Sequence, residues 1–209
     1  MAHKDCSSAH LVQLFDAPRS LADAVSHFLI DGRERGDQLL VMARASHWQL
    51  IRAYLERRGV AVDDPSERLT VIDARQMRAR MLRRGVPDPT RMHETVGELV
   101  AQLAEQPRVS ADAAQPRRPG GLRVYGEIVE LFAEEGNFEQ AIVLEEFWNY
   151  LIEKHRFTLL CGYSAAHFAD SSHMVDLQRI CACHTRVRTQ PSDTLGTWLT
   201  SAHQGSSIP

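Results

Sequence analysis

Residues 122–163 read LRVYGEIVELFAEEGNFEQAIVLEEFWNYLIEKHRFTLLCGY. Two short apolar runs, Leu122–Gly126 and Phe157–Tyr163, open and close this stretch, and their length is typical of β-strands. Between them the apolar residues recur at helical spacing, which predicts a helix up to Glu135 and a long helix over Phe138–His155. A strand followed by helices and then by another strand predicts parallel strands in one sheet.

The same alternation continues toward both ends of the chain. Further strands are predicted at Leu11–Phe15, Gln38–Ala43 and Leu69–Ile72. Further helices are predicted from Leu21 (with Ser20 as N-cap) to about Glu34, from Ser46 to Arg58, over Arg75–Arg84, from Asp88 to about Glu105, and over Val175–Ala182. Five strands that alternate with helices predict an α/β fold with a mainly parallel sheet, covered by helices on both faces.

Composition limits the class of protein. The chain has 209 residues, a formal net charge of −3, 44% hydrophobic residues and 24% charged residues. These values suit one globular core and exclude collagen-like, coiled-coil and wholly disordered chains. The longest apolar runs are too short to span a membrane, and the first residues lack the apolar segment of a secretion signal, so we expect a cytoplasmic protein. The nearly balanced charge argues against direct nucleic-acid binding.

The run Arg75–Arg84 is basic and amphipathic. One interpretation is a surface for nucleic acid or for an acidic partner. A solvated helix face, with Met77 and Met81 packed inward, agrees better with the balanced charge of the whole chain.

The sequence patterns of several enzyme classes are missing. The chain contains no GxxxxGK[ST] phosphate loop, no GxGxxG dinucleotide pattern, no GxSxG elbow and no HExxH zinc motif. The glycines are scattered and follow predicted helix ends. We therefore predict that the protein is not an enzyme and has no catalytic residues.

Candidate binding residues lie near the second half of the predicted sheet. Glu127 follows a strand and could accept hydrogen bonds from a ligand, or it could simply offset the dipole at a helix N-terminus. On the long helix, Glu145 and Asn149 flank Trp148 at i, i+4 spacing. This pattern is typical of a pocket wall, although a buried tryptophan in the core and a satisfied hydrogen-bond network explain it equally.

Histidine and cysteine side chains offer a second kind of site. His10, Cys161, Cys181 and His184 include enough nitrogen and sulfur ligands for zinc or another thiophilic metal. Cys161 shares a strand face with Tyr163, while Cys181 and His184 lie three residues apart on a predicted helix. None of these residues has the close CxxC spacing of a strong zinc motif, so buried structural thiols and a hydrogen-bonded histidine are the alternative.

At these residues the chain resembles the MEDS domain, the DcmR-like sensory domain named for methanogens and methylotrophs. The matching pieces are His10-Leu-Val-Gln-Leu-Phe15, Gly36-Asp37, Ile72-Asp73-Ala74, Gly85-Val-Pro-Asp88, Val124-Tyr-Gly-Glu-Ile-Val129, Glu135-Gly-Asn137, Leu144-Glu-Glu-Phe-Trp-Asn149, Leu159-Leu-Cys-Gly-Tyr163 and Ile180-Cys-Ala-Cys-His184. The resemblance implies a three-layer, RecA/KaiC-like domain without the phosphate loop, with a central sheet of about five or more strands. The expected domain covers residues 9–188, with a flexible loop at about 106–121 and mobile tails at 1–8 and 189–209.

The resemblance also implies a sensory function. Members of the family are joined to a histidine kinase, an ATPase module of anti-sigma type or a DNA-binding domain, and simple hydrocarbon derivatives are their proposed ligands. Where the family often has tyrosine, this chain has Phe15, which removes a hydroxyl group from the expected site. The candidate ligand-binding residues are His10, Gln13, Phe15, Glu127, Glu145, Trp148, Asn149, Cys161 and Tyr163.

These observations leave two main hypotheses. The first is a stand-alone sensory domain that binds a small molecule and regulates a signalling protein in trans, because few residues follow the expected domain; a homo-oligomer is compatible with it. The second is a thiol or metal sensor that uses His10, Cys161, Cys181 and His184, with zinc or another thiophilic metal as the candidate ion; the first hypothesis requires no cofactor. A degenerate nucleotide-binding protein is disfavoured, because no phosphate loop is present.

Overall fold

Six parallel strands form the central sheet within the part of the chain that the computed structural model describes, residues 8–106 and 121–189. The strands are β1 (Ala9–Phe15), β2 (Gln38–Ala43), β3 (Leu69–Asp73), β6 (Leu122–Gly126), β7 (Thr158–Ser164) and β8 (Arg186–Arg188). They lie in the order β3-β2-β6-β7-β1-β8. The predicted parallel α/β sheet is confirmed, with one strand more than the five located from the sequence.

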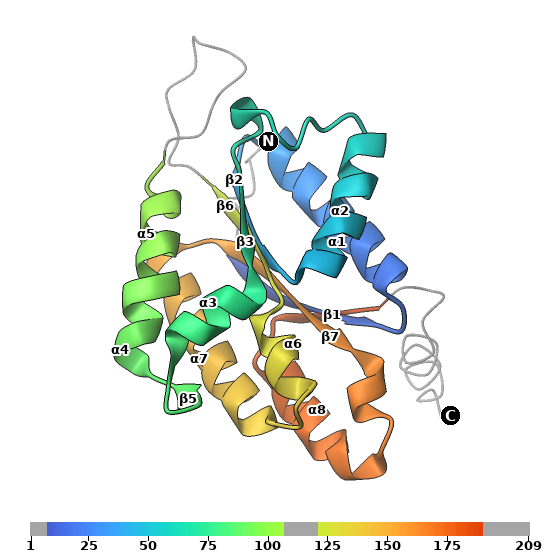
Figure 1. Ribbon diagram of the computed structural model, residues 1–209, viewed down its shortest axis with the longest axis vertical. Coiled ribbons are helices and arrows are strands. Elements are labelled where there is room, and N and C mark those ends of the chain that lie inside the picture. The colour runs from blue at the N-terminus through green and yellow to red at the C-terminus, as the bar shows by residue number, and fades with distance from the viewer. Residues whose placement is uncertain (1–7, 107–120, 190–209) are drawn as a thin grey trace, which may run out of the picture.

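Helices cover both faces of this sheet (Figure 1). The helices are α1 (Pro18–Glu34), α2 (Ala45–Arg57), α3 (Ala74–Met81), α4 (Pro89–Met92), α5 (Glu98–Ala104), α6 (Ile128–Ala133), α7 (Phe138–His155) and α8 (Met174–Ala182). A π-helical turn, His93–Gly97, joins α4 to α5. Helices α1 and α2 pack on one face, and α3 to α8 supply the core of the other. The protein is thus a three-layer α/β domain.

Side-chain alternation along the strands builds these two cores. In β1, Val12 and Leu14 join the core under α7, whereas Leu11 and Phe15 join the core under α1 and α2. All six residues of β2 are buried, as expected for an inner strand with helices on both sides.

Several element boundaries differ from the predictions, and one strand, β8, was not predicted. Helix α1 begins at Pro18 rather than after Ser20, because proline suits the first turn of a helix, and Ser20 Oγ donates to Ala17 O instead of capping. The basic helix stops at Met81, and the following residues form a short hairpin, β4 (Leu82–Arg83) and β5 (Val86–Pro87). Edge strand β8 escaped prediction because its three residues are all exposed and form no apolar run.

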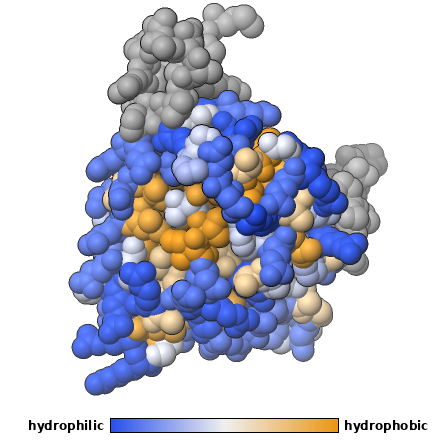
Figure 2. Space-filling view, turned by 45° about the horizontal axis from the view of Figure 1, so that its top comes forward, coloured by the Kyte–Doolittle hydropathy of each residue, from blue (hydrophilic) through white to orange (hydrophobic). Residues whose placement is uncertain are grey.

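The face drawn in Figure 2 is largely hydrophilic and carries a patch of apolar side chains near its middle. On the basic helix α3, Met77 and Met81 are buried as the solvated-face interpretation requires. Arg78 on this helix forms an ion pair with Glu135. In the described ranges no helix is long and apolar enough to cross a membrane. Apart from their bordering residues, the loop expected at about 106–121 and the expected tails lie outside the described part of the chain.

Candidate functional site

The connections that follow the neighbouring strands β2 and β6 go to opposite faces of the sheet. Met42 of β2 pairs with Gly126 of β6, so Arg44 and Glu127 leave the two strands at the same level. The helix after β2 packs on one face, and the helix after β6 packs on the other. In open α/β sheets such a point, where neighbouring connections go to opposite faces, is where ligands usually bind.

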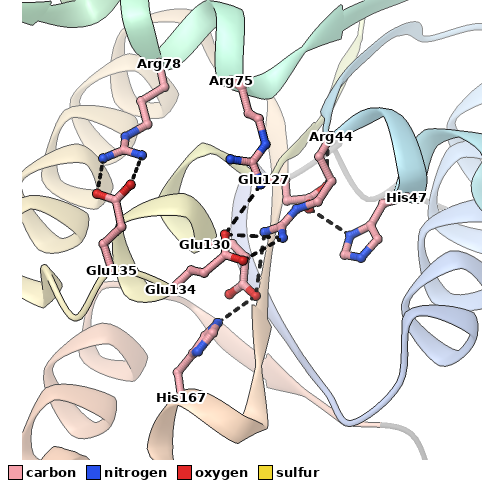
Figure 3. Close-up of polar contacts among 9 residues, drawn as sticks. All are labelled: Arg44, His47, Arg75, Arg78, Glu127, Glu130, Glu134, Glu135 and His167. Atoms are coloured by element: carbon pink, nitrogen blue, oxygen red, sulfur yellow. Dashed lines mark hydrogen bonds and ion pairs between the residues drawn. The ribbon is translucent and has the colours of Figure 1, made fainter.

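Polar side chains fill this point in the present protein (Figure 3). Glu127 is fully buried, and its carboxylate forms an ion pair with the guanidinium of Arg44. The backbone N–H of Arg44 also donates a hydrogen bond to Glu127 Oε2 at 3.2 Å. His47 Nδ1, on α2, lies 2.7 Å from Glu127 Oε1. The carboxylate of Glu127 is therefore compensated by groups of the protein itself.

Glu130, on α6, extends this network to the end of β7. Its carboxylate accepts a hydrogen bond from Ser164 N at 3.0 Å and lies 2.9 Å from His167 Nε2. Arg44 also approaches Glu130 at 3.9 Å and Glu134 at 3.4 Å. We call the five residues Arg44, His47, Glu127, Glu130 and His167 the edge network. It ties together the segments that follow β2, β6 and β7, which explains why its buried charges are tolerated.

The hydrogen bond to Glu130 raises the pKa of His167, against the opposing effect of burial. A raised pKa means that protonated His167 stabilises the folded state; this stability is complete below the unfolded pKa of about 6.5 and is lost as pH rises through the folded value. His167→Asn should therefore remove the part of the stability that the wild type loses as pH rises through the folded pKa of His167. Urea denaturation at a series of pH values above 6 tests this, and identical pH profiles for the variant and the wild type would contradict it.

A second cluster lies inside the core, between the sheet and helices α7 and α8. His10 comes from β1, Cys161 from β7, Glu145 from α7 and His184 from the residues after α8. Because His10 lies opposite Leu159 in the register of β1 with β7, His10 and Cys161 are diagonal neighbours on one sheet face. We call these four residues the core cluster.

The ligand atoms of the core cluster converge. His10 Nε2 lies 3.1 Å from Glu145 Oε2 and 3.5 Å from Cys161 Sγ. Cys161 Sγ lies 3.3 Å from Glu145 Oε2, and His184 Nε2 lies 3.4 Å from Glu145 Oε1. One ligand atom from each residue lies within 4.8 Å of all the others. The side chains of His10, Glu145 and His184 are at most 1% exposed.

Surrounding residues orient these side chains. His10 Nδ1 donates to Asn149 Oδ1 at 2.9 Å, and His184 Nδ1 donates to Ile180 O at 2.7 Å. With both Nδ1 atoms engaged, the Nε2 atoms face the centre of the cluster. Tyr163 OH donates to Glu145 Oε1 at 2.8 Å. Partners of this kind around histidine and carboxylate ligands are typical of protein metal sites.

Charge favours an ionised carboxylate and a neutral thiol in the core cluster. Burial raises the pKa of Glu145, but His184 and His10 outweigh it and hold that pKa far below its ordinary value. Burial and the Glu145 carboxylate raise the pKa of Cys161 well above the value of a free thiol. Because a redox-sensing cysteine needs a low pKa and access to solvent, Cys161 is poorly suited to that role.

A comparison with protein-family models shows to which family this chain belongs. A family model described as MEDS, the MEthanogen/methylotroph, DcmR Sensory domain, matches residues 9–185. The chain belongs to the MEDS family. No curated protein and no solved structure matches it. Since MEDS domains are sensory domains, the protein has a sensory role.

The MEDS domain brings together only some of the residues predicted from the sequence. His10, Glu145, Asn149, Cys161 and Tyr163 meet in or beside the core cluster, to which His184 also belongs. Cys181 lies outside it: its side chain packs at the border of the apolar core, and Glu145 supplies the fourth ligand atom instead.

The other predicted residues of this MEDS domain lie elsewhere. Glu127 belongs to the edge network, where its carboxylate contacts Arg44 and His47. Gln13 and Phe15 point to the opposite sheet face from His10, where Phe15 packs edge-on against the ring of His47. Trp148 is fully buried in the core.

Of the edge network, only Glu127 was identified from the sequence. The other four residues were missed: Arg44, His47, Glu130 and His167. Arg44 carries a local signal, because it directly follows a fully buried strand, at the carboxyl edge where parallel sheets place binding residues. The strand order was needed for the rest.

Two surface hollows lie away from both clusters. One, of about 630 Å³, is lined by Arg19, Tyr54 and Arg57 among others, and the second, of about 200 Å³, lies beside the π-helical turn at His93 and Gly97. None of the predicted ligand-binding residues, all in described parts of the MEDS domain, lines either hollow.

Proposed function

We propose that this MEDS domain senses a transition metal ion of the zinc class, held by His10, Glu145, Cys161 and His184. The observation that carries the proposal is the convergence of two imidazole nitrogens, a carboxylate oxygen and a sulfur within 4.8 Å. This mixture of nitrogen, oxygen and sulfur ligands suits Zn²⁺ and related ions.

The spacing of these atoms supports tetrahedral coordination. Metal–ligand bonds of roughly 2.0–2.3 Å place tetrahedral ligands roughly 3.3–3.8 Å apart. Three atoms of the core cluster, His10 Nε2, Glu145 Oε2 and Cys161 Sγ, lie 3.1–3.5 Å apart, and His184 Nε2 lies 3.4 Å from the other carboxylate oxygen, Glu145 Oε1. All four ligand atoms lie within 4.8 Å of one another. An ion therefore needs only small movements of the side chains. A small organic molecule, the ligand expected from the sequence, would have to separate side chains that are already in contact.

The chemistry inside the cluster also supports a metal. Four charged or polar side chains are buried together, and the acidic group of Glu145 is held ionised. A divalent cation would replace the proton on Cys161 and neutralise the resulting charges. The state of the site would then be passed to a signalling partner.

Metal titration tests this proposal. Protein prepared without a histidine tag and stripped with a chelator should bind one Zn²⁺ per chain in a competition assay with a chromophoric chelator. Co²⁺ in the same site should give the visible absorption of a tetrahedral ion and the sulfur-to-metal charge-transfer band of a thiolate ligand.

Two matched cysteine variants make the test specific. Cys161→Ser should abolish the charge-transfer band and weaken binding roughly 100-fold, because structural zinc sites gain on the order of 10 kcal/mol from four ligands. Cys181→Ser should leave both unchanged. Absence of stoichiometric binding by the wild type, or equal losses in the two variants, would overturn the proposal.

A further inference from the structure

We propose that the ion fastens the last described unit of the chain, α8 with β8, onto the body of the domain, so that metal occupancy is converted into docking or release of this unit. The inference rests on the proposed metal site. It follows from where the four ligands lie along the chain.

Three of the ligands belong to the body and one to the unit. His10, Glu145 and Cys161 lie on β1, α7 and β7, which are packed elements of the central layers. His184 lies between the end of α8 and the start of β8. A bound ion would therefore bridge the unit to the body, and His184 is the ligand that crosses from one to the other.

The unit itself has few other attachments. Helix α8 buries two side chains, Leu177 and Ile180, and packs Met174 and Cys181 against the core with partial exposure. The three residues of β8 are exposed at the edge of the sheet. The ion pair of Arg179 with Glu139 is exposed, and exposed pairs add little stability. Segments with few buried apolar contacts at a sheet edge open more easily than the rest of a domain.

The remaining attachments converge on the metal site. Thr185 N and Thr185 Oγ1 both donate to His10 O at 2.7 Å, and His10 N donates to Thr185 Oγ1 at 3.2 Å. Asn149 Nδ2 donates to Cys183 O at 3.0 Å, while the Oδ1 atom of the same amide accepts from His10. Asn149 thus orients a metal ligand and holds the unit at once. Any movement of the unit must disturb the site, and the reverse also holds.

Four protein ligands would complete a tetrahedral zinc site and would leave no open position for a further molecule. An ion in such a closed site affects the conformation of the protein and does not bind or activate a further molecule. If it binds only the docked form, it shifts the equilibrium between docked and released forms by about 100-fold at a concentration 100 times the dissociation constant. Release of β8 uncovers the outer edge of β1, where Leu11, Val12 and Gln13 are paired in the docked form.

Hydrogen exchange of the full chain, with Zn²⁺ as the only addition, tests the inference. Peptides covering residues 174–188 and 9–15 should exchange at least about tenfold more slowly with zinc. Peptides from α1 and α2, in the opposite layer, serve as the internal reference and should change much less. Trypsin cleavage after Arg179, Arg186 and Arg188 should slow by a similar factor.

Histidine variants separate the two proposals. His173→Ala, next to α8 but outside the core cluster, should keep the zinc effect, whereas His184→Ala should lose it. The wild type could bind zinc while its hydrogen exchange slows equally in all peptides, or in none. In that case the docking inference fails while the metal site stands. If zinc does not bind at all, the proposed function fails first.

Discussion

Replacing Glu127 with alanine is expected to lower the free energy of unfolding by about 3–5 kcal/mol. The fully buried carboxylate faces the Arg44 guanidinium and His47 and accepts a hydrogen bond from Arg44 N. Its removal leaves a largely buried arginine with only the longer contacts to Glu130 and Glu134, and a buried charge that loses its main partner is far more costly than the loss of an exposed ion pair. Urea denaturation followed by circular dichroism measures the difference.

Glu134 provides the matched control for this prediction. Its carboxylate also contacts Arg44, at 3.4 Å, but the side chain is 45% exposed. Glu134→Ala should cost less than about 1 kcal/mol. Glu127→Gln, which keeps the volume and one hydrogen-bond acceptor, should fall between the two alanine variants. Equal effects of Glu127→Ala and Glu134→Ala would show that the edge network does not hold the strand ends together.

Trp148→Ala is expected to destabilise the domain by about 3–5 kcal/mol, because it leaves a large cavity in a closely packed core. Trp148 is fully buried on α7, and its ring packs edge-on against Phe157 with centroids 6.3 Å apart. The prediction separates the two interpretations that the sequence left open. A tryptophan that lines a ligand pocket tolerates truncation better than one that fills the core.

Two further substitutions test the cause of that effect. Tyr150, on the same helix, is 45% exposed, so Tyr150→Ala should cost less than about 1 kcal/mol. Trp148 Nε1 has no hydrogen-bond partner among the described residues. Trp148→Phe should therefore cost less than Trp148→Ala, since it fills much of the volume and removes a buried unpaired donor. A Trp148→Ala protein as stable as Tyr150→Ala would rule out the core role.

Much of the fold could be predicted because its signals are local. Strand β2 is an unbroken apolar run and α7 carries a regular helical stripe, and both were located to the residue. Strand β8 carries no such signal: its side chains are exposed, and it forms only because β1 offers an unpaired edge. The order of the strands could not be predicted from local patterns either.

The candidate site was predicted in its parts but not in its assembly. His10, Cys161 and His184 were recognised as metal-binding residue types, whereas Glu145 was assigned to a ligand pocket and Cys181 to the metal. Their distances depend on the pairing of β1 with β7 and on the docking of α7, which are long-range facts. Choosing between Glu145 and Cys181 requires the direction in which each side chain points. That direction cannot be read from the spacing of residues along the sequence.

The place of β1 in the sheet also bears on how the chain reaches its native state. The first described strand, β1, pairs with β7 and β8, and its hydrogen bonds to Thr185 join residues 175 positions apart. Until ribosomes release those later segments, β1 has no neighbours in the sheet, and closing so long a loop slows folding. During this interval α1 and α2 are already made, while the apolar strand β1 remains exposed without a partner strand. Assistance by chaperones would matter most at this stage.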